Sequence, residues 1–255
     1  MSQRLAGRTA LVTGAGSGIG RRVATRFAEE GAAVVFTDRD LDAATEAVAG
    51  RRHCLAVRLD VSDESSVAAG FAAAAAAGYA LDVVVANAGV QLFGQDSAVA
   101  DLDLDVWRRT IDVNLTGCFL TLKHGVRALL ARTGGPAGGS IIVTGSPTAL
   151  NGEGRAFTAY ASSKAGMHGM ARAVAAAYAD RGIRVNTVVP GYTETPLVAA
   201  ISGDPADRAA IVSRIPLGRP GTPADVEGVM VFLASDESAY ATGAEFRVDG
   251  GMTTL

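Results

Sequence analysis

The stretch Thr9–Gly20, TALVTGAGSGIG, decides the fold of this chain. Its first five residues form a short apolar run that predicts a buried strand, and a helical pattern extends from Gly20 to Glu30. Glycines between a strand and a helix allow a tight turn, and they let phosphate oxygens approach the backbone N–H groups at the helix N-terminus. The stretch therefore predicts a strand–turn–helix unit that binds a phosphate-bearing ligand.

The same alternation of strand and helix continues to the C-terminus. Six further apolar runs predict strands at Ala33–Thr37, Cys54–Leu59, Leu81–Ala86, Ser140–Thr144, Arg184–Val188 and Glu245–Val248. Helices are expected at Leu41–Gly50, Val67–Ala77 (with Ser62 as a cap), Asp103–Val113, Leu115–Ala131, Tyr160–Asp180 and Pro223–Ala234, and a turn at Gly134–Gly139. Strands that are apolar on both faces belong to a parallel sheet covered by helices. We expect an α/β fold: one doubly wound, Rossmann-like domain over residues 1–255, with a seven-stranded parallel sheet and ligands at the carboxyl ends of its strands.

Composition argues against several other classes of protein. The net charge is −3 with both signs scattered, so no basic patch predicts a nucleic-acid or acidic membrane partner. The hydrophobic stretch from Val67 to Ala88 is mostly alanine and is interrupted by Gly70, Gly78 and Asp82, which favours a packed helix and strand over a membrane span. The N-terminus has no secretory-signal layout, which favours a cytoplasmic protein.

Neither a metal site nor a disulfide is expected. Cys54 and Cys118 lie far apart without a CxxC pair, which suits a reducing compartment. The three histidines, His53, His124 and His168, share no ligand spacing.

Asp38 ends the second predicted strand, 20 residues after Gly18. A carboxylate at this place can accept hydrogen bonds from both hydroxyls of an adenosine ribose and would repel a 2′-phosphate. It therefore favours NAD as cofactor. Arg39 follows directly and could pair with a 2′-phosphate, so NADP stays possible.

Tyr160 and Lys164 form a YxxxK pair at the start of a predicted helix. Side chains at i and i+4 share one helix face, one turn apart. A phenol has a pKa near 10, and a nearby ammonium moves that pKa toward the working range of an acid/base catalyst. The pair therefore predicts a tyrosine that takes and returns a proton.

These motifs together resemble the short-chain dehydrogenase/reductase family. The chain has the glycine pattern TGxxxGxG at Thr13–Gly20, the turn Asn87-Ala88-Gly89 after the fourth strand, and the YxxxK pair at Tyr160. The resemblance covers about residues 5–252, and it implies NAD(P)-dependent hydride transfer between a secondary alcohol and a ketone. It also implies a homotetramer.

Several site residues follow from the resemblance alone. It implies that Asn114 supports a proton relay to Lys164 and that Ser146 holds the substrate oxygen, with Thr148 as the fallback. The Ser146-to-Tyr160 separation is one residue longer than is common, so we expect an extra residue within Leu150–Phe157. The implied cofactor contacts are Gly14, Ser17, Gly18, Ile19, Gly20, Asp38, Arg39, Asp60, Val61, Asn87, Ala88, Gly89, Tyr160, Lys164, Pro190, Gly191, Thr193 and Thr195.

The substrate is not specified by these motifs. Thr148, Leu150, Arg155 and Tyr192 are expected near it, under a lid at about residues 190–217. Because NAD usually serves oxidation, Asp38 favours a dehydrogenase of a sugar, polyol or small hydroxy compound. The alternatives are an NADP-linked 3-oxoacyl-carrier-protein reductase and a cofactor-binding regulator, although a regulator would be expected to lose Tyr160 or Lys164.

Overall fold

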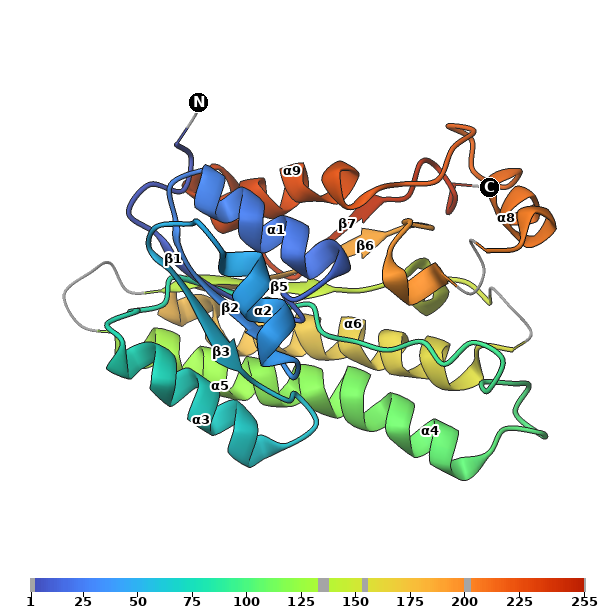
Figure 1. The fold of residues 1–255 in the computed structure, drawn as a ribbon, viewed down its shortest axis with the longest axis horizontal. Coiled ribbons are helices and arrows are strands. Elements are labelled where there is room, and N and C mark those ends of the chain that lie inside the picture. Colours follow the sequence, from blue (N-terminus) through green and yellow to red (C-terminus); the bar gives the residue numbers. More distant parts are fainter. Residues whose placement is uncertain (1–2, 133–137, 153–155, 200–202, 255) are drawn as a thin grey trace.

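The computed structural model describes residues 3–132, 138–152, 156–199 and 203–254. Seven strands form one parallel sheet in the order β3-β2-β1-β4-β5-β6-β7. They are β1 (Thr9–Thr13), β2 (Ala33–Asp38), β3 (Cys54–Arg58), β4 (Val83–Ala86), β5 (Gly139–Thr144), β6 (Ile183–Pro190) and β7 (Glu245–Val248). The doubly wound α/β fold expected from the sequence is confirmed (Figure 1).

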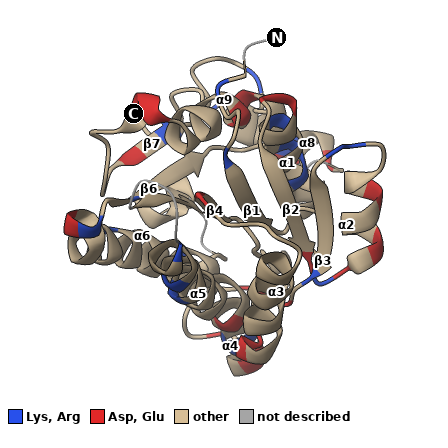
Figure 2. Ribbon diagram, turned by 90° about the vertical axis from the view of Figure 1, so that its left-hand side faces the viewer, with Lys and Arg blue, Asp and Glu red and all other residues tan. Residues whose placement is uncertain are grey.

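Helices cover both faces of this sheet, as Figure 2 shows in a view turned by 90°. One layer holds α1 (Gly18–Glu29), α2 (Leu41–Val48) and α9 (Pro223–Ala234), and the other holds α3 (Glu64–Ala76), α4 (Leu104–Ile111), α5 (Gly117–Ala131) and α6 (Thr158–Tyr178). A shorter helix, α8 (Pro205–Val212), lies near the carboxyl end of the sheet (Figure 1). Figure 2 shows both basic and acidic residues scattered over the described part of the molecule.

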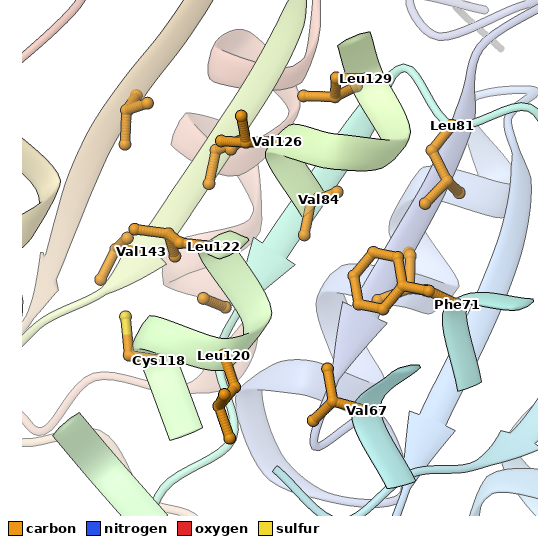
Figure 3. Packing of buried hydrophobic residues seen from close by; sticks show 14 of the residues in the cluster. Val67, Phe71, Leu81, Val84, Cys118, Leu120, Leu122, Val126, Leu129 and Val143 are labelled. Carbon is orange, nitrogen blue, oxygen red and sulfur yellow. The ribbon is translucent and has the colours of Figure 1, made fainter. Parts of the chain in front are cut away.

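Each helical layer packs on its own hydrophobic core. Side chains of α3 and α5, such as Phe71 and Leu122, meet Val84 of the central strand β4 (Figure 3). Phe27 of α1 and Met230 of α9 fill the opposite core and are fully buried. Burying apolar surface on both sides fixes the sheet, and with it the positions of the loops that leave its carboxyl edge.

The order in which successive strands join the sheet reverses at β1, which pairs with β2 on one side and β4 on the other. The loops after β1 and β4 therefore diverge to opposite faces and leave a crevice between them. In open α/β sheets this switch point is where ligands bind.

Several predicted boundaries were wrong. Asp63, rather than Ser62, caps α3 and accepts a hydrogen bond from Ser65 N. The two helices expected around Asn114 are continuous, because a π-helical segment, Asp112–Thr116, joins α4 to α5. Gly139 begins β5 instead of ending a turn, and residues 133–137 of that expected turn lie outside the described residues.

Candidate active site

A cavity of about 740 Å³ lies at the carboxyl edge of the sheet. It brings together nearly all of the side chains that the sequence singled out, from the glycine turn after β1 to Thr195 after β6. Two predicted site residues, Gly20 and Asn114, are not among the residues that line the cavity. Leu150 does not line the cavity either, and Arg155 lies outside the described residues.

The glycine turn is shaped by contacts that leave no room for a side chain. Gly14 has a φ of +66° and lies against the backbone of Ala88. A Cβ on Gly20 would lie 2.1 Å from the Gly14 carbonyl oxygen and 2.5 Å from Asn87 Nδ2. The start of α1 therefore sits directly on the turn, where its free N–H groups and dipole favour a phosphate.

Asn87 ties this turn to the centre of the sheet. Its Nδ2 donates to the Thr13 carbonyl oxygen at 3.0 Å, and its Oδ1 accepts from Thr144 Oγ1 at 3.2 Å. One side chain thus links β1, β4 and β5 beside the cavity. This bracing agrees with the structural role that the family resemblance implies for Asn87.

Asp38, the last residue of β2, lines the cavity beside the glycine turn. Its Oδ2 accepts a hydrogen bond from Gly16 N at 3.0 Å, which fixes the carboxylate against the glycine turn. Arg39 also lines the cavity there. Asp60 lines the cavity as well, and its Oδ1 accepts from both the backbone N and the hydroxyl of Ser62.

These residues fit a nicotinamide dinucleotide. The glycine cradle, which a Cβ would fill, can take a pyrophosphate, and Asp38 can accept hydrogen bonds from a ribose. At the other end Pro190, Gly191, Thr193 and Thr195 line the wall, and the Thr193 hydroxyl donates to the Gly191 carbonyl oxygen at 3.0 Å. That segment is held in place by a bridge between Thr193 and Gly221.

Tyr160 and Lys164 project from the first turns of α6 into the middle of the cavity. The Lys164 ammonium lies 5.7 Å from the centre of the Tyr160 ring and donates to the Thr144 carbonyl oxygen at 2.9 Å. Both side chains are buried, at 8% and 4% exposed. Burial is therefore the main influence on their protonation.

The pKa values of this pair move in opposite directions. Burial raises the pKa of Tyr160 to about 12, against a hydrogen bond from Ser146 that lowers it. Burial lowers the pKa of Lys164 to about 8. In the protein alone, then, the phenol holds its proton, and further positive charge in the cavity is needed to stabilise a phenolate.

Ser146 follows β5, and its hydroxyl acts on the Tyr160 phenol by lowering the pKa of that group. Its Oγ also accepts from the Thr148 hydroxyl at 3.0 Å, and Pro147 between them starts a short 3-10 turn, Pro147–Ala149. Both residues line the cavity, but only Ser146 lowers the pKa of the Tyr160 phenol. The geometry thus favours Ser146 over the fallback Thr148 as the group beside Tyr160.

Asn114 lies within the π-helical segment and is completely buried. Its Nδ2 donates to the Val90 carbonyl oxygen and to Ser163 Oγ, and its Oδ1 accepts from Val90 N. A π-bulge of this kind often marks a functional site. Here it turns Asn114 toward α6 and the loop after β4, behind Lys164.

Sequence reasoning missed Asp96, a buried carboxylate that caps α6. Phe157, at the N-cap position, makes no side-chain cap, and Asp96 instead accepts hydrogen bonds from Ala159 N at 3.1 Å and Tyr160 N at 3.0 Å. A carboxylate at a helix N-terminus is stabilising. Since the cap lies more than sixty residues upstream of the helix, no local pattern could have indicated it.

Sequence reasoning also missed several apolar residues of the cavity wall. Phe93 and Phe157 pack edge to face there, with ring centres 5.7 Å apart, and both line the cavity. Leu197, Ile211 and Met252 line the same cavity, from the segment after β6 and from the C-terminal region. Arg214, just after α8, adds a basic side chain.

Comparison with known proteins fits this geometry. A family model described as enoyl-(acyl carrier protein) reductase matches residues 14–253. The chain is 44% identical to cis-4-hydroxycyclohexanecarboxylate dehydrogenase of Sinomonas cyclohexanicum, over 100% of each chain. A short-chain type dehydrogenase/reductase from Mycobacterium marinum has a crystal structure that superposes with a TM-score of 0.90 at 35% identity, covering 99% of this chain and 98% of that one. The chain belongs to the short-chain dehydrogenase/reductase family.

The name of a second relative also refers to an alcohol on a cyclohexane ring. Cyclohexanol dehydrogenase of an Acinetobacter species is 36% identical to this short-chain dehydrogenase/reductase, over 100% of this chain and 98% of that one. Dehydrogenases of the family use NAD(P) as cofactor. In the described part of the chain, no three His, Cys, Asp or Glu side chains gather as metal ligands. No described helix is both long and apolar enough to span a membrane.

Proposed function

We propose that this protein is an NAD-dependent dehydrogenase of secondary alcohols carried on a cyclohexane-type ring. The observation that carries the proposal is the position of Tyr160 and Ser146 beside an apolar pocket walled by Phe93 and Phe157. An alicyclic ring would bury its CH₂ groups against these side chains, at about 0.8 kcal/mol each. The names of the two dehydrogenases above support the same substrate class.

The cavity residues have distinct tasks in this proposal. In the oxidation direction Ser146 binds the substrate hydroxyl and Tyr160 takes its proton. Lys164 binds the nicotinamide ribose and, with its charge, favours the phenolate. When bound, the dinucleotide supplies the hydride acceptor, and its positive ring lowers the pKa of Tyr160 from the high value of the free protein.

NAD, rather than NADP, is proposed because of Asp38. Its carboxylate lies where the adenosine ribose would bind, and a 2′-phosphate would meet a like charge. The lid expected at about residues 190–217 stays a proposal, supported by Leu197 and Ile211, which line the pocket. Residues 200–202 of that range lie outside the described residues. The homotetramer expected from the family stays a prediction.

A sugar or polyol is less well matched, because it would set hydroxyl groups against the phenylalanine pair without partners. The acyl-carrier-protein reductase alternative is supported by the family model's description and by Arg39, which lines the cavity and could pair with a 2′-phosphate. It would require NADP and a basic entrance for an acidic carrier protein.

The test is a panel of initial rates with purified protein, in which NAD(H) and NADP(H) are each combined with different substrates. The substrates are cyclohexanol, cis- and trans-4-hydroxycyclohexanecarboxylate, sorbitol and an acetoacetyl thioester. We expect the highest kcat/KM for NAD with a ring alcohol. Preferential NADPH-linked reduction of the thioester, or oxidation of sorbitol alone, would overturn the proposal.

A further inference from the structure

His168 is a buried histidine one turn beyond Lys164 on α6, only 2% exposed, and the chemistry above does not use it. With Tyr160 and Lys164 it completes a row of side chains at i, i+4 and i+8 on one helix face. The row starts at the cavity and ends at His168, which lies beside Gly145 after β5 and Thr187 of β6. His168 therefore lies behind the catalytic pair, under the loop that carries Ser146.

The hydrogen bonds of the ring fix its tautomer. Nδ1 lies 3.0 Å from Glu245 Oε1, at the start of β7, and Arg172 Nη1 donates to the same oxygen at 2.8 Å. An ionised carboxylate only accepts, so Nδ1 carries the proton and donates it. In the neutral ring Nε2 is then an acceptor, and it faces the backbone N–H of Ser146 at 3.4 Å.

The ring also sets the path of the chain before Ser146. A Cβ added to Gly145 would lie 2.1 Å from His168 Nε2 and 2.8 Å from Thr187 Cγ2. Gly145 N donates to the Val188 carbonyl oxygen at 2.7 Å, so the turn is held between β6 and the imidazole. Only glycine allows the backbone to approach the ring this closely.

Burial favours the neutral form of the His168 ring. Burial lowers its pKa, and the positive charges of Lys164 and Arg172 act in the same direction, against Glu245, which raises it. A protonated ring would turn an N–H toward the Ser146 N–H and lose the hydrogen bond.

We propose that His168, oriented by Glu245, is a positioning residue that holds the Gly145–Ser146 backbone and thereby keeps the Ser146 hydroxyl at the Tyr160 phenol. Arg172 holds Glu245, Glu245 holds the imidazole at Nδ1, and the imidazole contacts the turn through Nε2. The inference rests on the proposed role of Ser146 in binding the substrate oxygen. Neither His168 nor Glu245 touches the cavity.

A double-mutant cycle tests this role. His168→Leu removes the acceptor at similar volume, and His168→Gln can restore one through its amide oxygen. We expect His168→Leu to lower kcat by about tenfold, with the KM and the dissociation constant for NAD unchanged, and His168→Gln to recover most of the rate. In a Ser146→Ala background, measured by single turnover with enzyme in excess, the loss caused by His168→Leu should shrink to less than about twofold.

His124→Leu is the matched control. His124 also contacts a glutamate, Glu64, at 3.4 Å, but it lies on α5 away from the cavity. Its replacement should leave kcat within about twofold of the wild type, whether Ser146 is present or not. A His168→Leu loss of equal size in both backgrounds, or a His168→Gln variant as slow as His168→Leu, would overturn the proposal.

A measurement without turnover separates this inference from the proposed function. The chain has three histidines, so ¹⁵N-labelled imidazoles give few NMR signals to assign. We expect His168 to show a protonated Nδ1 and a bare Nε2 that Glu245→Gln perturbs. An unprotonated Nδ1 would refute the proposed positioning of His168 by Glu245, even if the protein oxidises ring alcohols. The expected tautomer without any alcohol turnover would leave the hydrogen-bonded pair in place and refute the proposed function.

Discussion

The two ends of the cavity are built in different ways. At the nucleotide end the walls are largely backbone: Gly14 and Gly20 pack against Ala88 and Asn87 with no room for a side chain. At the substrate end the walls are side chains such as Phe93 and Ile211, carried by loops and by the segment after β6. Backbone contacts tolerate little change, whereas loop side chains can be exchanged without altering the sheet. The contrast explains why the motifs indicate a cofactor clearly and a substrate poorly.

Tyr160 stands between these two ends and gives the largest expected effect. Tyr160→Phe removes the proton acceptor but keeps the ring, so we expect kcat for alcohol oxidation to fall by about 10³-fold. Thermal stability and NADH affinity should stay near the wild-type values, because the substitution removes only the hydroxyl and leaves the buried ring in place. Stopped-flow rates and fluorescence titration measure the two effects. A variant with normal turnover would exclude Tyr160 as the acid/base.

Asp38 tests the nucleotide end by charge alone. Asp38→Ser keeps an acceptor for Gly16 N but removes the like charge that opposes a 2′-phosphate, so we expect the NADP-to-NAD ratio of kcat/KM to rise about 100-fold. The double variant Asp38→Ser/Arg39→Gln is the control. If Arg39 pairs with the 2′-phosphate, the double variant loses most of the gain. An unchanged ratio in Asp38→Ser would mean that Asp38 does not select the cofactor.

Gly20 tests the same end by steric contact. A Cβ at this position would overlap the Gly14 carbonyl oxygen, so Gly20→Ala should lower the free energy of unfolding by about 1–3 kcal/mol and weaken NADH binding. The matched control is Gly228→Ala in α9, where a Cβ meets no atom within 4 Å and where alanine is the better helix former by about 0.8–1.0 kcal/mol. Denaturant titration should therefore give opposite signs for the two variants. Two equal changes would contradict the close packing at the glycine turn.

The same contrast separates what the sequence could predict from what it could not. Strand–helix alternation and the glycine spacing predicted the sheet and the nucleotide end, because both depend on local patterns along the chain. The cap of α6 by Asp96 and the contact of His168 with Glu245 join residues more than sixty positions apart, so only the folded chain reveals them. The sequence predicted two separate helices around Asn114, whereas a π-helical segment joins them. One extra residue in a single helical turn does not produce a recognisable pattern of apolar residues.

Arg214 tests the substrate end and has the smallest expected effect. It lies just after α8 on the cavity wall, and at the substrate end it is, with Lys164, one of the two cationic side chains among the described lining residues. It would attract a carboxylate on the far side of a ring alcohol. Because the side chain is exposed, we expect Arg214→Met to raise KM for 4-hydroxycyclohexanecarboxylate by only about two- to fivefold, while KM for cyclohexanol stays unchanged.

Arg208→Met is the control for this last prediction. Arg208 belongs to α8 and pairs with Glu194 at 2.8 Å, but it does not line the cavity. Its loss should affect both ring alcohols equally, through the placement of α8 alone. If Arg214→Met also raised both KM values together, its role would be to hold the segment after β6 rather than to select an anionic substrate. A change confined to the carboxylated alcohol would show that even this exchangeable end of the cavity selects by charge.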